Sequence, residues 1–363
     1  MKIISVFNNK GGVGKSTLSF HLGKALGLMG KKVLFVDLDP QCNLTISAMR
    51  ENELENIWQE EDSYIEDFET AKEKNSEEYL KIIGETRSIH FLLKPAEDGV
   101  NDIEKLPPAR IISENVYMIP GRLSIHQFEN KISDRWSGLY QSDNLSIRTI
   151  TYIRRVCERY AETLGVDFVL VDTSPSLGIL NKTIISTVDG FIIPAQPDMF
   201  SLYGIRNIGN SLASWGKELN TIYNLISEEK REKFPKKFVQ FLGYTIYNAK
   251  KYDGNNEYQL ADAHYSYAKR IPEVIKQYIK DDNKIHVDDM PIAGKAIMHT
   301  HNTYPSVAQS LKCAIWEVPD VFTKLQQTEP EYLTEQMVDV NRGSFGRYRD
   351  IKDKYIEFAI ALI

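Results

Sequence analysis

The chain has 363 residues, of which 42% are hydrophobic and 26% charged, and its formal net charge at pH 7 is −6. This composition supports a large buried core and excludes a disordered chain, and no run of eighteen apolar residues marks a membrane span. Three distant cysteines, Cys42, Cys157 and Cys313, exclude a disulfide scaffold and lack zinc-site spacing. We therefore expect a cytoplasmic protein with reduced cysteines.

A glycine-rich loop follows the first predicted strand. Residues 3–7 are mostly apolar, a helical pattern begins at Leu18, and between them the chain reads Asn9-Lys10-Gly11-Gly12-Val13-Gly14-Lys15-Ser16-Thr17. Glycines let successive backbone N–H groups point inward, Lys15 supplies a charge for the β- and γ-phosphates, and Ser16 offers a hydroxyl to Mg²⁺. A plain strand-to-helix turn would not require all these parts together, so residues 11–17 predict binding of a nucleoside triphosphate.

This loop departs from the usual phosphate-loop pattern in two places. Position 9 is Asn9 instead of glycine, and Lys10 precedes the glycines. The K-G-G-V-G-K-S-T string resembles the deviant Walker A loop of the ParA/MinD family of ATPases. In that family the first lysine reaches across a nucleotide-sandwich dimer to the partner's phosphates, and the resemblance implies this role for Lys10. It also implies ATP and Mg²⁺ as cofactors and a homodimer that forms on ATP binding.

Two aspartates end the second predicted strand. Residues 33–36 are apolar, and Asp37 and Asp39 follow at the carboxyl end, where ligands bind in open α/β sheets. The D-x-D-P-Q-x-N-x-T string from Asp37 resembles the switch I segment of ParA/Soj-type ATPases, with Cys42 where glycine is usual. By that match Asp39 orients the attacking water and contributes to the Mg²⁺ site, whereas Asp37 is structural. On turn chemistry alone, both acids can instead simply end a strand.

Two further strands carry candidate site residues. Residues 168–171 are apolar and end in Asp172, which predicts a Walker B strand whose aspartate accepts hydrogen bonds from water on Mg²⁺. The D-T-S-P-S-L-G continuation resembles the family's second switch. A later strand, residues 238–248, ends in Asn248, which the resemblance assigns to the adenine base; capping of a strand end explains Asn248 equally well.

Strands that alternate with longer amphipathic stretches predict an α/β fold, a doubly wound and mostly parallel sheet with helices on both faces. Right-handed crossovers then place the ends of the three motif strands on one edge. Residues 51–110 are rich in Glu and Asp and too long for a loop, so we expect helices added to the core there and at 206–237. With a C-terminal helical tail at 320–363, the chain is expected to form a single elaborated P-loop ATPase domain, 1–363.

These motifs predict a Mg²⁺-dependent ATPase that is slow without a partner, because phosphoryl transfer depends on positioning and charge stabilisation. The resemblance implies DNA partition through nucleotide-switched dimerisation, nonspecific DNA binding and a ParB-like adaptor. Two alternatives remain open. One is a positioning ATPase for a protein or membrane cargo, with the acidic segment 51–110 as its docking region. The other is a metabolic P-loop ligase, against which Lys10 and the D-P-Q-x-N-x-T string argue.

The net charge of −6 does not favour DNA binding, but local basic patches decide this property. Candidate patches, each also explained as an ordinary solvated face, are residues 230–237, Lys250-Lys251, and Arg342, Arg347, Arg349, Lys352 and Lys354. Residues 355–363 are mostly apolar and contain no Lys or Arg, so we expect a helix packed on the core and not a membrane anchor.

Overall fold

The computed structural model describes residues 1–363 apart from 75, 250–255, 281–296, 300–302, 336–339 and 341. Within this described part, an eight-stranded sheet has the order β3-β4-β2-β5-β1-β6-β7-β8. Its strands are β1 (Lys2–Val6), β2 (Val33–Asp37), β3 (Arg110–Ser113), β4 (Val116–Ile119), β5 (Phe168–Asp172), β6 (Gly190–Ala195), β7 (Gln240–Ala249) and β8 (Ile297–His299). Neighbouring strands are parallel except β3 and β4. The predicted doubly wound, mostly parallel α/β sheet is confirmed.

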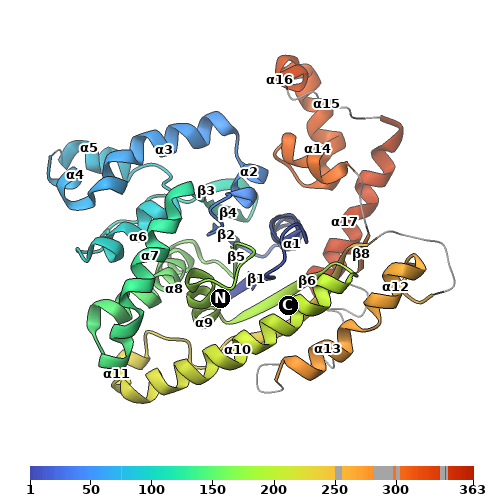
Figure 1. Cartoon of the computed structure of the whole chain (residues 1–363). Coiled ribbons are helices and arrows are strands. Elements are labelled where there is room, and N and C mark those ends of the chain that lie inside the picture. Colours follow the sequence, from blue (N-terminus) through green and yellow to red (C-terminus); the bar gives the residue numbers. More distant parts are fainter. Residues whose placement is uncertain (75, 250–255, 281–296, 300–302, 336–339, 341) are drawn as a thin grey trace.

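Helices surround this sheet (Figure 1). In the first half of the chain they are α1 (Lys15–Leu28), α2 (Asn43–Ala48), α3 (Glu51–Glu66), α4 (Phe68–Lys74), α5 (Ser76–Ile82), α6 (Ile89–Asp98), α7 (His126–Arg135), α8 (Asn144–Leu164) and α9 (Ile179–Thr187). In the second half they are α10 (Met199–Leu225), α11 (Glu228–Arg231), α12 (Asp262–Ala268), α13 (Ile271–Tyr278), α14 (Tyr304–Ser310), α15 (Val318–Thr328), α16 (Pro330–Glu335) and α17 (Phe345–Ile360). Short 3₁₀ helices are η1 (Leu123–Ile125), η2 (Trp136–Gln141), η5 (Ile315–Glu317) and η6 (Arg342–Ser344).

Alternate strand residues supply two separate hydrophobic cores, one on each face of the sheet. Ile3 packs in one core and Ile4 in the other, as expected when successive side chains point to opposite faces. The first core includes side chains of α6, α7, α8, α9 and α10, and the second those of α1, α2, α15 and α17. Because both faces are covered, the central strands are nearly continuous apolar runs.

The acidic segment after α2 is largely helical. Helices α3 to α6 occupy residues 51–98, and the chain then forms β3, an edge strand that the sequence analysis did not predict. β3 turns into β4 at Glu114 and Asn115, and Asn115 has a φ of 61°. This turn was the available signal, but four residues with an exposed Ile111 carry too little periodicity to indicate a strand.

Residues 206–237 contain most of α10 and the short α11. β6 and β7 are adjacent and parallel, so the chain must cross over between them. Helix α10 makes that crossover, and it contributes Ile205, Ile208 and Leu212 to the first core. Helix α10 is therefore required by the topology of the sheet.

Helix α17, near the end of the chain, packs on α1. The ring of Tyr355 stacks on His21 with centroids 5.1 Å apart, and Phe358 is buried in the second core. Burial lowers the pKa of His21 to about 4, and the neutral ring accepts a hydrogen bond from the Ile315 N–H at 3.0 Å. The apolar end of the chain thus supports the helix that follows the phosphate loop. Among the described residues, no helix is long and apolar enough to cross a membrane.

Candidate nucleotide-binding site

The loop between β1 and α1 has a backbone suited to phosphate. Gly12 and Gly14 have φ values of 71° and 79°, in the left-handed region that favours glycine. Gly14 is the N-cap of α1, where no side chain caps the free N–H groups, and a Cβ there would lie 2.0 Å from the Tyr247 ring. The amino end of α1 therefore presents N–H groups and the positive end of its dipole to an anion.

Parallel pairing brings the predicted carboxylates to the same edge as this loop. Asp37 on β2 lies opposite Asp172 on β5, and both are fully buried. Lys15 and Asp39 are also buried. Burial lowers the pKa of the Lys15 ammonium, and the charges of Asp172 and Asp39 oppose that change. The structure thus brings Lys15, Asp39 and Asp172 together.

Asp172 has the character of a cation ligand. Neither of its buried carboxylate oxygens has a protein partner within normal hydrogen-bond geometry. Burial, and then the charge of Asp37, raise the pKa of Asp172 well above its usual range, against the opposing effects of Ser16 and Lys15. An unpaired buried carboxylate is costly unless a cation or its water shell satisfies it. The residues present therefore fit a Mg²⁺ held near Ser16 and Asp172.

In the described residues no group of three or more His, Cys, Asp or Glu side chains is arranged as a metal centre. Mg²⁺ commonly keeps several waters and takes one or two protein ligands together with substrate phosphates. A Mg²⁺ bound in this way would take part of its coordination from the phosphates of a bound nucleotide. The position of Ser16 at the start of α1, next to the glycine loop, is consistent with such a site.

Asp37 has a different environment from Asp172. Its Oδ2 accepts hydrogen bonds from the Thr45 N–H at 2.8 Å and the Thr45 hydroxyl at 2.7 Å, and its Oδ1 accepts from the Asp39 N–H at 3.1 Å. Burial raises the pKa of Asp37 to about 6 although these hydrogen bonds oppose the rise. Asp39 in turn accepts from the Gln41 N–H at 3.0 Å. Asp37 therefore fixes the conformation of the segment that carries Asp39 by hydrogen bonds to Asp39 and Thr45.

Lys10 is held within its own chain. Its ammonium donates to Gln196 Oε1 at 3.1 Å, forms an ion pair with Asp198, and lies 5.9 Å from the centroid of the Phe200 ring. Burial acts to raise the pKa of Asp198, but hydrogen bonds and the charge of Lys10 lower it overall. The sequence analysis did not identify Gln196 and Asp198 as site residues. The available signal was their position within three residues of the carboxyl end of β6, at the same edge of the sheet.

The remaining predicted site residue, Asn248, lies in β7, and its side chain is outside the described residues. Its neighbour Tyr247 is buried against Gly14. The end of β7 therefore lies beside the phosphate loop.

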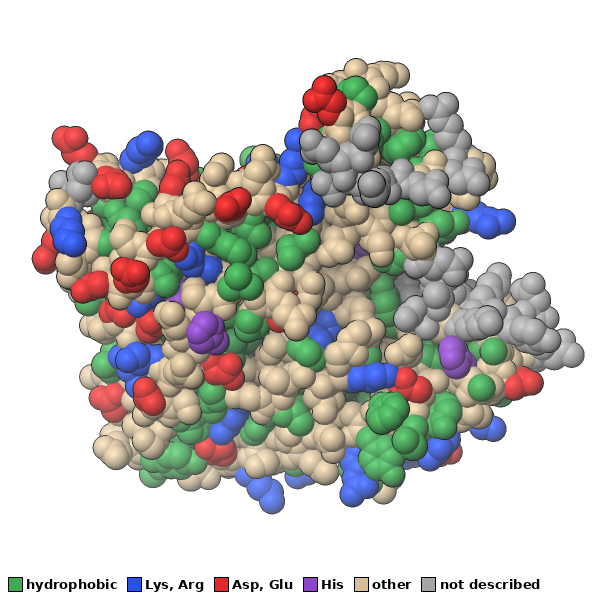
Figure 2. All heavy atoms as spheres, turned by 45° about the horizontal axis from the view of Figure 1, so that its top comes forward, with side chains coloured by type: hydrophobic (Ala, Val, Ile, Leu, Met, Phe, Trp, Pro, Cys, Tyr) green, Lys and Arg blue, Asp and Glu red, His purple; other side chains and the backbone are tan. Residues whose placement is uncertain are grey.

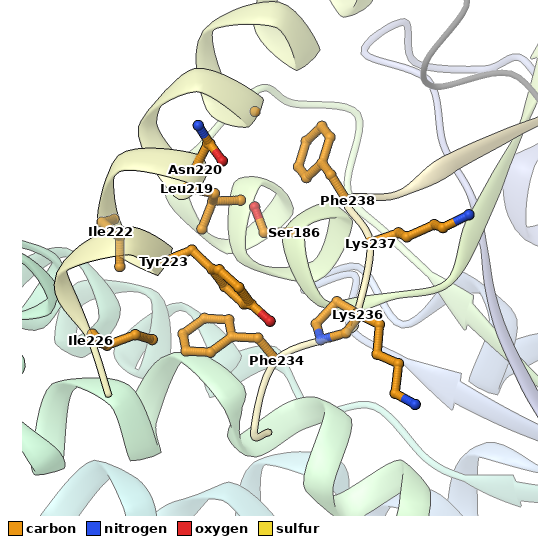
Figure 3. Close-up of a pocket in the computed structure, with 12 residues that line it drawn as sticks. Ser186, Leu219, Asn220, Ile222, Tyr223, Ile226, Phe234, Lys236, Lys237 and Phe238 are labelled. Carbon is orange, nitrogen blue, oxygen red and sulfur yellow. The ribbon is translucent and has the colours of Figure 1, made fainter. Parts of the chain in front are cut away.

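A cavity of about 210 Å³ lies between α9, α10 and residues 234–238, as Figure 3 shows. Its lining includes the rings of Tyr223, Phe234 and Phe238, and the hydroxyl of Ser186, which is buried without a hydrogen-bond partner. These residues precede the amino ends of β6 and β7, so the cavity is at the opposite edge of the sheet from Lys15.

Comparison with known proteins identifies the family. The AAA_31 family, described as an AAA domain, matches residues 1–225, and the chain belongs to it. Its ParA/Soj type is also confirmed: the sporulation initiation inhibitor protein Soj of Bacillus subtilis is 28% identical over 220 residues, which are 61% of this chain and 68% of Soj. The chain also matches an uncharacterised protein of Mycobacterium tuberculosis at 28% identity over 60% of this chain, but over only about half of that protein, 54%.

Solved structures show the same fold. Protein DIP2308 from Corynebacterium diphtheriae has a TM-score of 0.61 at 22% identity, covering 88% of this chain and 98% of that one. The pNOB8 ParA structure has a TM-score of 0.54 at 20% identity, covering 99% and 98% of the two chains. A further structure, of pNOB8 ParA bound to nonspecific DNA, has a TM-score of 0.51 at 18% identity and covers 94% and 99%.

Proposed function

We propose that this protein is a Mg²⁺-dependent ATPase that dimerises on binding ATP and acts in plasmid or chromosome partition through nonspecific DNA binding. The observation that carries this proposal is the group of Lys15, Asp39 and Asp172 beside a glycine loop that also bears Lys10. Membership of a P-loop ATPase family and the DNA-bound state of pNOB8 ParA support it.

In this proposal each residue has a defined task. The N–H groups at the start of α1 and the Lys15 ammonium hold the β- and γ-phosphates, and Ser16 and Asp172 hold Mg²⁺, which when bound would neutralise phosphate charge. Asp39 positions the attacking water. Lys10 leaves Asp198 and contacts the phosphates of the partner subunit. Hydrolysis is slow until a ParB-like adaptor orders the segment that carries Asp39.

A protein cargo is the second candidate, and the distribution of charge favours it. Figure 2 shows acidic side chains gathered over the part of the surface formed by α3 to α5, and the net charge is −6. Two basic residues of the predicted DNA-binding patch 230–237 form hydrogen bonds within the chain. Lys230 donates to the Ser142 carbonyl at 2.6 Å and Arg231 to the Tyr223 carbonyl at 2.8 Å. Another patch, Lys250-Lys251, lies outside the described residues.

Binding to nonspecific duplex DNA tests the proposal. The protein is measured with ATP, with ADP and without nucleotide across a series of salt concentrations, while light scattering reports its oligomeric state. Lys15→Ala should abolish ATP binding, and Lys10→Ala should retain ATP binding but lose the dimer. We expect salt-sensitive DNA binding with ATP only, lost in both variants, because phosphate neutralisation by Lys and Arg depends on salt.

If ATP drives dimerisation but DNA is not bound even at low salt, the partition role is wrong and the cargo is a protein or a membrane. Asp39→Ala should give an ATP-bound dimer that does not hydrolyse ATP. Normal hydrolysis by that variant would contradict the role of Asp39.

A further inference from the structure

Gly121, which is separated from the end of β4 by Pro120, lies between the segment 37–45 and helix α3. Its N–H donates to Thr45 Oγ1 at 2.8 Å, and its carbonyl oxygen accepts from the Trp58 indole N–H at 3.0 Å. We propose that Trp58 and Gly121 are positioning residues of the nucleotide site, which hold the segment 37–45 for hydrolysis through Thr45. This inference rests on the proposed function, since ATP hydrolysis is the reaction that it concerns.

The hydrogen bonds of this relay have a fixed direction. The Gly121 N–H can only donate, so the Thr45 hydroxyl accepts from it and uses its own hydrogen for Asp37 Oδ2, 2.7 Å away. Asp37 also accepts from the N–H of Asp39, the residue assigned to the attacking water. A displacement at Gly121 therefore reaches Asp39 through only two side chains, those of Thr45 and Asp37.

The space around Gly121 makes this coupling tight. A Cβ at position 121 would lie 3.0 Å from Cys42 Sγ and 3.1 Å from Asp37 Cγ, closer than ordinary van der Waals contact. Cys42 is itself buried and has a φ of 53°. The segment 37–45 thus packs directly on the backbone of Gly121 and cannot move toward it independently.

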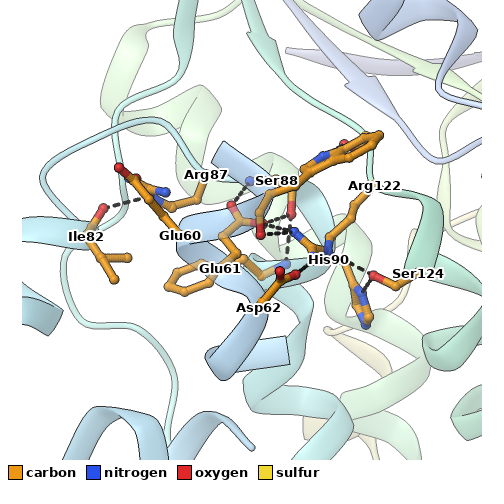
Figure 4. A network of polar contacts seen from close by, with 12 residues as sticks. Glu60, Glu61, Asp62, Ile82, Arg87, Ser88, His90, Arg122 and Ser124 are labelled. Carbon is orange, nitrogen blue, oxygen red and sulfur yellow. Dashed lines mark hydrogen bonds and ion pairs between the residues drawn. The ribbon is translucent and has the colours of Figure 1, made fainter. Parts of the chain in front are cut away.

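The other end of the relay is anchored in α3. Arg122, next to Gly121, donates to the Trp58 carbonyl at 2.8 Å and to Glu61 Oε2 at 3.3 Å, and it forms an ion pair with Asp62. Figure 4 shows Glu61, Asp62 and Arg122 converging at this point. Trp58 is therefore bonded to residues 121 and 122 through both its indole and its carbonyl group. Helix α3 and the residues after β4 form one unit.

Two substitutions test the relay. Trp58→Phe keeps an aromatic ring but removes the donor to Gly121, and Thr45→Val keeps the shape of Thr45 but removes its hydroxyl. Each should lower kcat for ATP by about fivefold or more while the Kd for ATP changes by less than about twofold, because the partly buried bond from Trp58 has roughly this worth and the Thr45 bond to the Asp37 carboxylate has at least as much. Thr45→Ser, which restores the hydroxyl, should recover the rate.

A matched control is Trp136→Phe. Trp136 also donates its indole N–H, to Glu218 Oε1 at 2.6 Å, but no described hydrogen bond joins it to Gly121 or to the segment 37–45. Removal of this indole N–H in Trp136→Phe should leave kcat for ATP unchanged. If Trp58 and Thr45 act in one relay, the fold-decrease in kcat of the double variant Trp58→Phe/Thr45→Val should be smaller than the product of the two single fold-decreases. Additive effects, or a wild-type kcat for Trp58→Phe, would overturn the inference.

Hydrogen–deuterium exchange separates this inference from the proposed function. In the nucleotide-free protein, Trp58→Phe should speed exchange of the Gly121 and Thr45 amides, and Trp136→Phe should not. If the wild-type protein hydrolyses no ATP, the proposed function is wrong. Amide exchange then tests the relay by itself: unchanged exchange of the Gly121 and Thr45 amides in Trp58→Phe would show that the relay is absent. If wild type hydrolyses ATP and Trp58→Phe matches it in rate and exchange, only the relay fails.

Discussion

Two regions of the molecule bury charged side chains in different ways. At the nucleotide edge, Asp172 is buried with both carboxylate oxygens unpaired, and Lys15 is buried with a lowered pKa. Between α3 and α6, buried Glu61 accepts hydrogen bonds from the Ser88 N–H at 2.6 Å and the Ser88 hydroxyl at 2.5 Å, and Lys94 bonds Glu97 at 2.9 Å. A buried carboxylate without a hydrogen-bond partner, such as Asp172, is typical of a ligand-binding site, whereas buried charges that are paired are typical of a structural role.

The largest effect should follow from Asp172→Asn, which keeps the shape but removes the charge. We expect ATP hydrolysis to fall by about 100-fold or more, because the Mg²⁺ site that we propose would lose its carboxylate. The nucleotide-free protein should instead become more stable by ~1–3 kcal/mol, because an unpaired buried charge is removed. Steady-state kinetics and urea unfolding measure the two changes.

The pH dependence sharpens this prediction. The pKa of Asp172 is raised in the folded protein, so its ionisation destabilises the fold more as pH rises. The stability gained by Asp172→Asn should therefore grow with pH and vanish in acid. A loss of stability at pH 8 would contradict the contrast between the two regions.

On the structural side, Arg122→Met should destabilise the protein by ~3 kcal/mol, since it removes the ion pair between Arg122 and buried Glu61. The control is Arg110→Met: Arg110 is a 44% exposed residue paired with Glu53, and its loss should cost less than ~1 kcal/mol. Urea unfolding with and without ATP decides the outcome. Full rescue of Arg122→Met by ATP would contradict the structural role assigned to the pair of Arg122 and Glu61.

The sequence could predict that Lys15, Asp39 and Asp172 lie together, because these residues follow strands or belong to one contiguous string. Lys15 and Ser16 are adjacent, and Asp172 ends an apolar run. By contrast, the contacts of Lys10 with Asp198 and of Trp58 with Gly121 join residues 188 and 63 positions apart. No local periodicity encodes such pairs, because they arise only when the sheet is assembled.

Glu61→Gln should change how stability depends on pH. Burial raises the pKa of Glu61 to about 7 in the folded protein, against an ordinary value of 4.5, although Ser88 and Arg122 oppose the rise. The folded state therefore binds the proton more tightly, and stability contributed by protonated Glu61 is lost as pH rises from about 4.5 to 7.

Glutamine cannot ionise, so Glu61→Gln should flatten the stability profile in that window by up to ~3 kcal/mol. Urea unfolding at several pH values measures this, with Glu60→Gln as the exposed control. An unchanged slope would show that Arg122 keeps Glu61 ionised throughout.

Asp198→Asn should have the smallest effect on stability. The ion pair with Lys10 is partly exposed, so its loss should cost less than ~1 kcal/mol, and asparagine can still cap α10 at the Ser201 N–H, which Asp198 now bonds at 2.9 Å. Because Lys10 would no longer have this competing partner, dimerisation with ATP should strengthen by up to about fivefold.

Analytical ultracentrifugation across protein concentrations measures that change, and Asp320→Asn, which removes an exposed pair with Arg349, is the control. Asp198 has two possible relations to the dimer. If it only holds Lys10 in the single subunit, Asp198→Asn and Lys10→Ala act in opposite directions on dimerisation. If both substitutions weaken the dimer equally, Lys10 needs Asp198 in the ATP-bound state as well. The Lys10–Asp198 pair then has a structural role, as the paired charges of α3 and α6 do.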